Sequence, residues 1–354
     1  MGRYVKWFRE LGIEDVDEVG GKNASLGEMY RNLTSEGVRV PNGYAVTADA
    51  YRHLLEANGV VPKLHELLDD LNYDDVEELQ KRGAECRKII QQCEIPEDLK
   101  DEILKGYKEL KKEYGETLSL AVRSSATAED SPEASFAGQN DTYLHIAGEE
   151  ALLDAYLRCL ASNFTDRSLH YKHDHGFDWS KVYLSVVVMK MVRSDKASSG
   201  VMFSIDTETG FKDVVFINAD YGLGENVVQG TVEPDSFYVH KPTFEKGYRA
   251  VLKRRLGRKE LKMVFASELN TGNIAVEYTK NVETSKEEQE RFCISDDDVM
   301  VLADYAIKVE NHYSKKAGYR KPMDMEWAKD GLDGRLYMVQ ARPETVESQK
   351  KGNI

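Results

Sequence analysis

The chain has 354 residues, which is enough for two typical domains whose cores need no disulfide or metal to fold. Its 41% hydrophobic and 31% charged content is that of a globular protein and excludes a disordered chain. The net charge of −14 excludes nucleic acid and anionic membranes as partners of the surface as a whole, so an anionic ligand such as ATP would need a local pocket of cations or a metal.

The amino-terminal segment and the cysteines predict a cytoplasmic enzyme. Charges interrupt MGRYVKWFRE where a signal peptide would be apolar, and the longest apolar run, 182–192, is broken by Lys190 and is too short to cross a membrane. No pair of cysteines has a zinc-binding spacing, so we expect reduced core or helix residues at Cys86, Cys93, Cys159 and Cys293.

Apolar periodicity predicts helices first and strands later. Helices are expected over 22–32, 50–57, 76–92 and 99–114, with strands over 118–124, 182–192, 200–205, 214–219 and 237–240. Ser295 can cap a further helix that ends at Gly318. The apolar stripe of this helix is expected at Val299, Leu302, Ala306, Val309 and Tyr313.

The first segment with potential chemistry is GGKNASLG, residues 20–27. Paired glycines ahead of Lys22 at a helix start can bring N–H groups and an ammonium onto a phosphate. The spacing is not that of a Walker A loop. A tight turn followed by a solvated lysine explains the same residues.

The second segment begins where a strand ends at Arg123 and gives way to a stretch rich in Ser, Thr, Ala and Gly that includes Gly138 and Thr142. Small side chains allow close approach of a ligand to the backbone, and a guanidinium suits phosphate. An ordinary surface loop is the alternative.

The third segment is a hairpin predicted from Asp330-Gly331 and Asp333-Gly334. Pairing centred near Asp333 sets Glu326 opposite Gln340 and Asp324 opposite Arg342 on one face, with Met325, Trp327, Val339 and Ala341 on the other. A carboxylate and an amide oxygen so placed can hold Mg²⁺ that also binds phosphates. A salt-bridged, solvated face is the alternative.

Two further segments have simpler interpretations. His170, His173 and His175 invite a metal hypothesis, but only the first two would share a helix face, so surface histidines are the better interpretation. Gly222-Leu223-Gly224-Glu225 is either a loop that contacts ligand or a plain turn.

Together these segments resemble the amino-terminal domain of the phosphoenolpyruvate synthases. The resemblance runs from Gly20 to Glu344 and is carried by GGKNASLGEM, PNGYAVTADA, AVRSSATAED, ASFAGQ, ASSGVMFSIDTETGF, GLGENVVQGTVEPDSFYVHKP, PMDMEWAKDG and LYMVQARPET. It implies an α+β, ATP-grasp fold in which two lobes clamp ATP: 1–180, with an amphipathic helical segment 50–115, and 181–346, followed by a linker at 347–354.

The resemblance also implies roles for individual residues. Lys22 and Arg123 would contact phosphates, and Arg342 the transferring group, which makes these three the catalytic candidates. Gly138 and Thr142 would line the nucleotide loop, and Met189 would hold adenine at the hinge. The metal ligands would be Glu326 and Gln340.

The activity implied is phosphoryl transfer from Mg-ATP to a histidine on a swivelling domain, and on to pyruvate on a barrel domain, giving phosphoenolpyruvate, AMP and phosphate. None of the eight histidines follows Cys, Ser or Thr, as the family's acceptor does, so both partner domains are expected in the same gene or a separate chain. A rifamycin phosphotransferase-like domain and a nucleotide-binding module without turnover are the alternatives. SSATAEDSPEASFAGQ after Arg123 favours the synthase over pyruvate phosphate dikinases.

Overall fold

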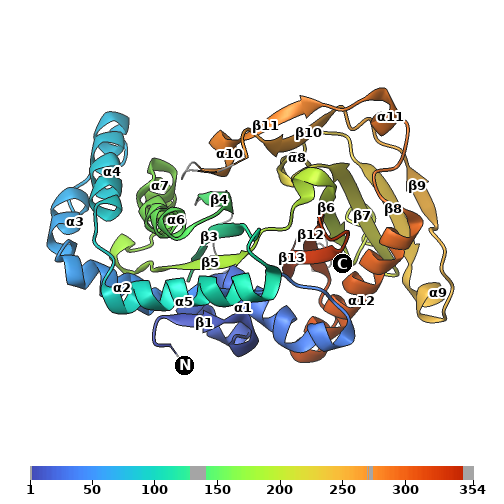
Figure 1. Ribbon diagram of the computed structural model, residues 1–354, viewed down its shortest axis with the longest axis horizontal. Coiled ribbons are helices and arrows are strands. Elements are labelled where there is room, and N and C mark those ends of the chain that lie inside the picture. Colours follow the sequence, from blue (N-terminus) through green and yellow to red (C-terminus); the bar gives the residue numbers. More distant parts are fainter. Residues whose placement is uncertain (1, 128–140, 269, 271–273, 346–354) are drawn as a thin grey trace, which may run out of the picture. The chain divides into compact units, whose positions relative to one another are not determined.

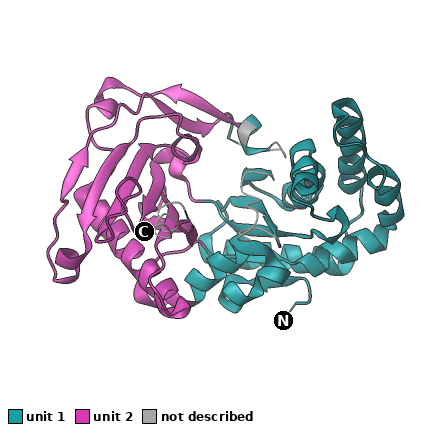
Figure 2. Ribbon diagram, turned by 180° about the vertical axis from the view of Figure 1, so that it is seen from behind, with its two compact units in different colours: residues 1–31, 42–191, 267–278 teal, residues 32–41, 192–266, 279–354 magenta. Residues whose placement is uncertain are grey.

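The computed structural model describes residues 2–127, 141–268, 270 and 274–345, and combines helices with antiparallel sheets (Figure 1). The mixed α and β composition expected from the sequence is confirmed. The chain forms two compact units, coloured separately in Figure 2. Unit 1 comprises residues 1–31, 42–191 and 267–278, and unit 2 comprises residues 32–41, 192–266 and 279–354.

Unit 1 contains a five-stranded antiparallel sheet with the order β1-β2-β5-β3-β4. Its strands are β1 Val5–Trp7, β2 Gly43–Val46, β3 Leu120–Ala126, β4 Thr142–Ile146 and β5 Leu184–Lys190. Its helices are α1 Val16–Leu33, which ends at the boundary with unit 2, α2 Ala48–Asn58, α3 Val61–Leu68, α4 Val76–Gln91, α5 Glu97–Tyr114, α6 Glu149–Ala161, α7 Asp166–Asp174 and α10 Ala275–Tyr278.

The two faces of the unit 1 sheet are covered by different helices. Val122 and Val188 are opposite each other on one face, in the main core, which also contains buried residues of α2, α4, α5 and α6. On the other face α1 approaches the sheet, where the Asn23 side chain donates to the Ser185 hydroxyl at 3.1 Å. The sequence-predicted helices over 50–57, 76–92 and 99–114 correspond to α2, α4 and α5.

A distant segment of the chain completes unit 1. Residues 267–278 return to it, and Asn270 forms a parallel bridge with Ile146 at the end of β4. The Asn270 amide donates to the Leu144 carbonyl at 2.8 Å, and His145 is 2.8 Å from the Glu268 carbonyl. The outer strand of the sheet therefore depends on a segment more than 100 residues further along the chain.

Unit 2 contains a six-stranded antiparallel sheet with the order β13-β12-β6-β7-β8-β9, and a separate two-stranded antiparallel sheet of β10 and β11. Its strands are β6 Ser198–Phe203, β7 Val214–Tyr221, β8 Asp235–His240, β9 Lys253–Arg255, β10 Leu261–Phe265, β11 Thr279–Glu283, β12 Met323–Lys329 and β13 Leu336–Pro343. Its helices are α8 Glu225–Gln229, α9 Lys241–Glu245, α11 Lys286–Gln289 and α12 Asp296–Ala317.

Helix α12 packs against the core face of this sheet, on strands β7, β8, β12 and β13. The Ser295 hydroxyl accepts from the Asp298 N–H at 3.1 Å, and Gly318, at φ 78°, ends the helix, as the sequence predicts. All five residues of the predicted apolar stripe are buried: Val299, Leu302, Ala306, Val309 and Tyr313.

The pairing of β12 with β13 confirms the predicted register in its first half. Asp324 is opposite Arg342 and Glu326 is opposite Gln340. The register then shifts, so that Trp327 pairs with Met338. The prediction that Val339 shares the face of Trp327 is therefore wrong, because this bulge displaces β13 by one residue, and Val339 packs instead beside Ala328 and Tyr337.

Two further features bear on the sequence predictions. Among the described residues, no helix combines the length and the apolar character needed to span a bilayer. The four cysteines are all free thiols, and three of them, Cys86, Cys93 and Cys159, are buried.

Candidate functional site

The first part of the candidate site is the turn that leads into the Lys22 segment of α1. Gly20 has φ 77°, and a Cβ at this position would lie 2.3 Å from the Ser125 hydroxyl oxygen and 2.5 Å from the Ser125 carbonyl oxygen. Only glycine fits this approach of the helix to β3. The Asn23 N–H then donates to the Ser125 hydroxyl, and the Lys22 ammonium donates to the Ser124 carbonyl at 3.1 Å.

Three other predicted residues lie on the sheet face that α1 approaches. Arg123 in β3 is opposite Thr142 in β4 and Val187 in β5, and Met189 in β5 is opposite Ala121. Because opposed residues of antiparallel strands point to the same face, and residues two apart share it, Arg123, Thr142 and Met189 lie on one side of the sheet. Arg123 and Thr142 are half-buried, whereas Met189 is buried.

Unit 1 thus brings four of its predicted site residues together. Lys22 contacts the carbonyl of the residue directly after Arg123, on the face that also contains Thr142 and Met189. The remaining predicted residue of this group, Gly138, lies outside the described residues, as does the predicted linker 347–354. Strand β3 continues to Ala126, so Arg123 lies within the strand and not at its end. Two cations beside this strand suit a polyanionic ligand.

The second part of the candidate site is the β12–β13 hairpin of unit 2. The Arg342 guanidinium is 3.0 Å from the Asp324 carboxylate, and both side chains are half-buried. Glu326 and Gln340 are the adjacent pair on the same face, with Cβ atoms roughly 5 Å apart for directly opposed residues. Met325 and Trp327, on the opposite face, are buried and fix the hairpin against the core.

A further carboxylate, Glu225, is close enough to this hairpin to feel the charge of Glu326, and its loop is the Gly222-Leu223-Gly224-Glu225 segment that is either a ligand loop or a plain turn by sequence. Ser199, on the same sheet face as Glu326, donates its hydroxyl to the Gly222 carbonyl at 2.6 Å and holds the loop there. Burial, and then the negative charge of Glu326, raise the pKa of Glu225. The sequence signal was the acidic residue directly after a Gly-x-Gly turn at a strand end, which alone does not distinguish a ligand loop from a plain turn.

Glu225 and Glu326 are suited to binding a cation that is also coordinated by a bound ligand. Burial and the negative charge of Glu326 raise the pKa of Glu225, and a divalent cation nearby would offset both effects, while the Gln340 amide supplies a neutral oxygen. Within the described ranges, no three His, Cys, Asp or Glu side chains cluster closely enough to hold a metal alone. Such an incomplete ligand set is typical of Mg²⁺ sites in which phosphate oxygens and water complete the coordination.

The chain matches the family described as the pyruvate phosphate dikinase, AMP/ATP-binding domain, over residues 16–354. The chain belongs to this family. Several curated proteins are similar to the chain along nearly its whole length. Phosphoenolpyruvate synthase of Helicobacter pylori is 52% identical over 98% of this chain, and that of Synechocystis is 50% identical over 99%. Phosphoenolpyruvate synthase of Escherichia coli K12 is 48% identical over 98% of this chain.

The chain spans less than half the length of these relatives. It covers 42% of the Helicobacter pylori protein, 43% of the Synechocystis protein and 42% of the Escherichia coli protein. As a member of the AMP/ATP-binding domain family, this chain therefore corresponds to a part of those longer proteins.

The three histidines at the C-terminal end of α7 are all exposed and contact neighbouring side chains. His170 pairs with Asp174 at 2.9 Å, and His173 stacks on Tyr73 with ring centroids 4.2 Å apart. His175 stacks on Tyr171. Each ring is thus engaged by a neighbour from α7 or from the α3–α4 connection, which agrees with their interpretation as surface residues.

Proposed function

We propose that this chain is the ATP-binding part of a phosphoenolpyruvate synthase. In this proposal it has an ATP-grasp fold with lobes 1–180 and 181–346, and both parts of the candidate site serve one Mg-ATP. The observation that carries the proposal is the β12–β13 register, which sets Asp324 against Arg342 and Glu326 against Gln340 on one half-buried face. Similarity to phosphoenolpyruvate synthases along nearly the whole of this chain supports the proposal and favours it over a rifamycin phosphotransferase.

The proposed roles follow from the chemistry of each side chain. Lys22 and Arg123 neutralise phosphate charge from one part of the site, and Arg342 offers a planar guanidinium to the transferring group from the other. Thr142 and Met189 share the face of Arg123, which supports contacts with the nucleotide there. The hydrogen bond from Lys22 to the Ser124 carbonyl orients its ammonium before a ligand arrives.

Glu326 and Gln340 would hold Mg²⁺, and Glu225, whose pKa is raised by burial and by the charge of Glu326, would add a third oxygen donor. A bound Mg²⁺ would neutralise triphosphate charge and hold the phosphate oxygens in place for transfer. The chain's own contribution is to position these donors: the buried Met325 and Trp327 fix β12, and the Ser199 contact fixes the Glu225 loop. The net charge of −14 makes this local neutralisation necessary for ATP binding.

The reaction proposed for the whole protein follows from its longer relatives. The terminal pyrophosphoryl unit of ATP would pass to a histidine on another domain, which releases AMP, and water would then remove its outer phosphoryl group as phosphate. The phosphoryl group left on the histidine would pass to pyruvate on a further domain and give phosphoenolpyruvate. The part assigned to this chain is binding ATP and aligning its phosphates. Positioning and charge neutralisation account for most of the rate gain in phosphoryl transfer.

Calorimetric titration with ATP in the presence of Mg²⁺ tests the assignment. We expect Glu326→Gln to abolish the Mg²⁺ dependence of ATP affinity, and Arg342→Gln to weaken ATP binding by about tenfold or more, because each removes a charge next to the phosphates. The matched control for the arginine is Arg335→Gln, which removes the same charge from the exposed turn of the same hairpin.

Two results would overturn the proposal. The first is ATP affinity that responds equally to Arg335→Gln and Arg342→Gln, which would make the effect one of net charge. The second is Mg²⁺-dependent ATP binding that survives in Glu326→Gln. Thermal unfolding of each variant separates a binding effect from a loss of folded protein.

A further inference from the structure

Unit 2 has a pocket of about 340 Å³ that none of the proposed ATP contacts uses. It lies where β6 begins and where β7 and β12 end, beside α11 and the segment that follows it. Ser198, Tyr221 and Lys329 line it and share the sheet face of Met202 and Trp327. Glu326 points to the opposite face, so the sheet separates this pocket from the β12–β13 part of the candidate site.

The lining carries more positive than negative charge. Its cations are Lys196, Lys262, Arg291 and Lys329, whereas its carboxylates are Asp195 and Glu288. Both carboxylates are already engaged by cations: Arg193 contacts Asp195 at 2.9 Å, and Lys262 contacts Glu288 at 2.5 Å. The lining is therefore a local positive site on a chain of net charge −14.

Two of the four cations can meet a ligand at low cost. Lys196 is exposed and has no ion pair within the part of the chain that the structure describes. Arg291 pairs at 3.2 Å with Glu287, whose side chain is 82% exposed, and such solvated pairs contribute little free energy. The Arg291 guanidinium also donates to the Tyr221 hydroxyl, which in turn donates to the Glu288 carbonyl at 3.1 Å.

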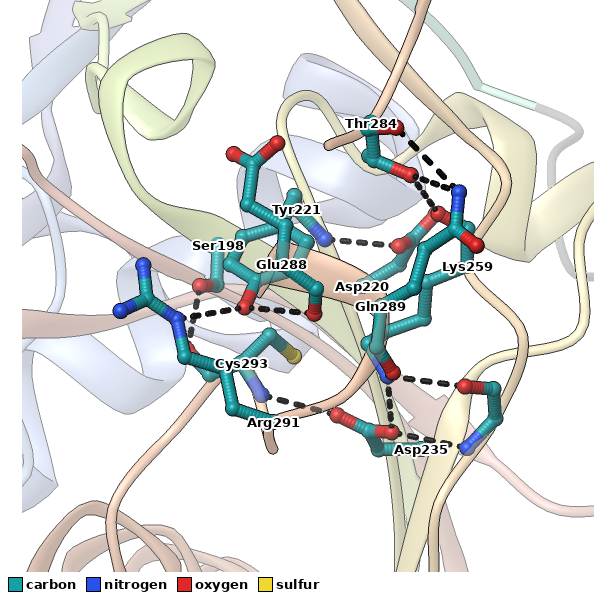
Figure 3. Close-up of polar contacts among 11 residues, drawn as sticks. Ser198, Asp220, Tyr221, Asp235, Lys259, Thr284, Glu288, Gln289, Arg291 and Cys293 are labelled. Atoms are coloured by element: carbon teal, nitrogen blue, oxygen red, sulfur yellow. Dashed lines mark hydrogen bonds and ion pairs between the residues drawn. The ribbon is translucent and has the colours of Figure 1, made fainter. Parts of the chain in front are cut away.

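The wall that carries Glu288, Arg291 and Cys293 is fixed from behind by a buried ion pair (Figure 3). Asp235 and Lys259 are fully buried, with their charged atoms 2.7 Å apart. Asp235 accepts from the Cys293 N–H at 2.8 Å, and the Ser198 hydroxyl donates to the Cys293 carbonyl at 2.9 Å. The pocket is thus preformed, which lowers the entropy cost of binding.

We propose that this pocket binds a small organic anion with at least two negative charges, held by Lys196 and Arg291 with the Tyr221 hydroxyl beside them. A volume of about 340 Å³ is that of roughly ten water molecules, which suits a phosphate monoester or a di- or tricarboxylate rather than a whole nucleotide. The shared chemistry is a compact dianion against a guanidinium and an ammonium. The proposal is independent of the proposed ATP site, because the two use different residues and the β12–β13 part of the ATP site lies on the opposite face of this sheet.

Isothermal titration calorimetry at low ionic strength with glycerol 3-phosphate and with citrate tests this proposal. We expect saturable binding of at least one probe to the unmodified chain. Binding should weaken by about tenfold or more in the double variant Lys196→Gln/Arg291→Gln, which removes two exposed charges and leaves the buried Asp235–Lys259 pair intact. The control Arg342→Gln should retain it, and ATP titration of the double variant should match the unmodified chain.

The outcomes decide between the alternatives. Binding of glycerol 3-phosphate alone would narrow the ligand to phosphate monoesters, and binding of citrate alone would narrow it to carboxylates. The proposal is overturned if neither probe saturates, if the double variant binds as tightly as the unmodified chain, or if Arg342→Gln alone abolishes binding. The last result would assign the probes to the ATP site.

Discussion

Lys172 in α7 is a buried lysine without a carboxylate partner in the part of the chain that the structure describes, and its replacement tests the energetics of unit 1. Its side chain is 1% exposed, and its ammonium donates to the main-chain and side-chain oxygens of Asn163 at 2.5 and 2.6 Å. Burial lowers the pKa of Lys172 from 10.5 to about 7. The charged form is therefore disfavoured in the folded protein and favoured in the unfolded chain.

The sign of the pH dependence follows from proton binding. Between about pH 7 and 10.5 the unfolded chain holds a proton on this lysine that the folded protein lacks, so the free energy of unfolding rises with pH in that window. With these two pKa values the rise from pH 7 to pH 9 is about 2 kcal/mol. Lys172→Met should remove this rise, whatever its effect on stability at a single pH through the lost bonds to Asn163.

The assay is urea unfolding followed by tryptophan fluorescence at pH 7 and pH 9, since Trp7 and Trp179 both belong to unit 1. Lys181→Met, at a lysine whose side chain is 79% exposed, is the matched control and should keep the dependence of the unmodified chain. Equal pH dependence in Lys172→Met and the unmodified chain would refute the reasoning. It would mean that Lys172 stays charged in the folded state despite its burial.

Three further predictions concern other parts of the chain. Gly20→Ala should destabilise the protein by more than about 1 kcal/mol and weaken ATP binding, because the new methyl group would clash with Ser125 and the residue would keep a left-handed φ. The control Gly59→Ala, at φ 60° with open space around it, should show only the cost of the left-handed φ. Equal urea midpoints for the two variants would contradict this prediction. Burial raises the pKa of Asp220 to about 7, so this group stabilises the folded state fully below its unfolded pKa and the stabilisation is lost as pH rises through 7. From pH 5 to pH 7 the unfolding free energy of the unmodified chain should therefore fall by about 2 kcal/mol relative to Asp220→Asn. Parallel plots of unfolding free energy against pH for the two proteins would exclude a raised pKa. Ser295→Ala should lower the free energy of unfolding, measured in urea, by about 1 kcal/mol because it removes the N-cap of α12. An unchanged free energy of unfolding would argue against the capping box.

Local sequence patterns were sufficient to predict the register of the β12–β13 hairpin near its open end and the two ends of helix α12. The Asp-Gly pairs predict the hairpin and place Glu326 opposite Gln340, because turn position and strand periodicity fix a register. The same argument placed Val339 on the wrong face of the hairpin, because a one-residue bulge cannot be recognised in an apolar stretch of sequence. Ser295 and Gly318 bounded α12 correctly for the same local reason.

Features that depend on contacts between distant segments could not be predicted from the sequence. Nothing near Glu225 indicates that its pKa is affected by the charge of Glu326, which is about 100 residues away in the chain. The need for glycine at position 20 is set by Ser125, also from a distant segment. Short strands such as β1, with three residues, and β4, with five, were missed because so few residues show no clear alternation. The roles of Lys22 and the other site residues stay predictions.

The return of residues 267–278 to unit 1 determines how the chain can be divided for experiments. A piece ending at residue 191 would keep most of unit 1 but would leave the Leu144 carbonyl and His145 open to water at the rim of β4, where Asn270 and Glu268 now contact them. A single cut therefore yields no intact half. Anyone wishing to study unit 1 alone would have to graft the returning segment back by a short tether, much as in a circular permutant.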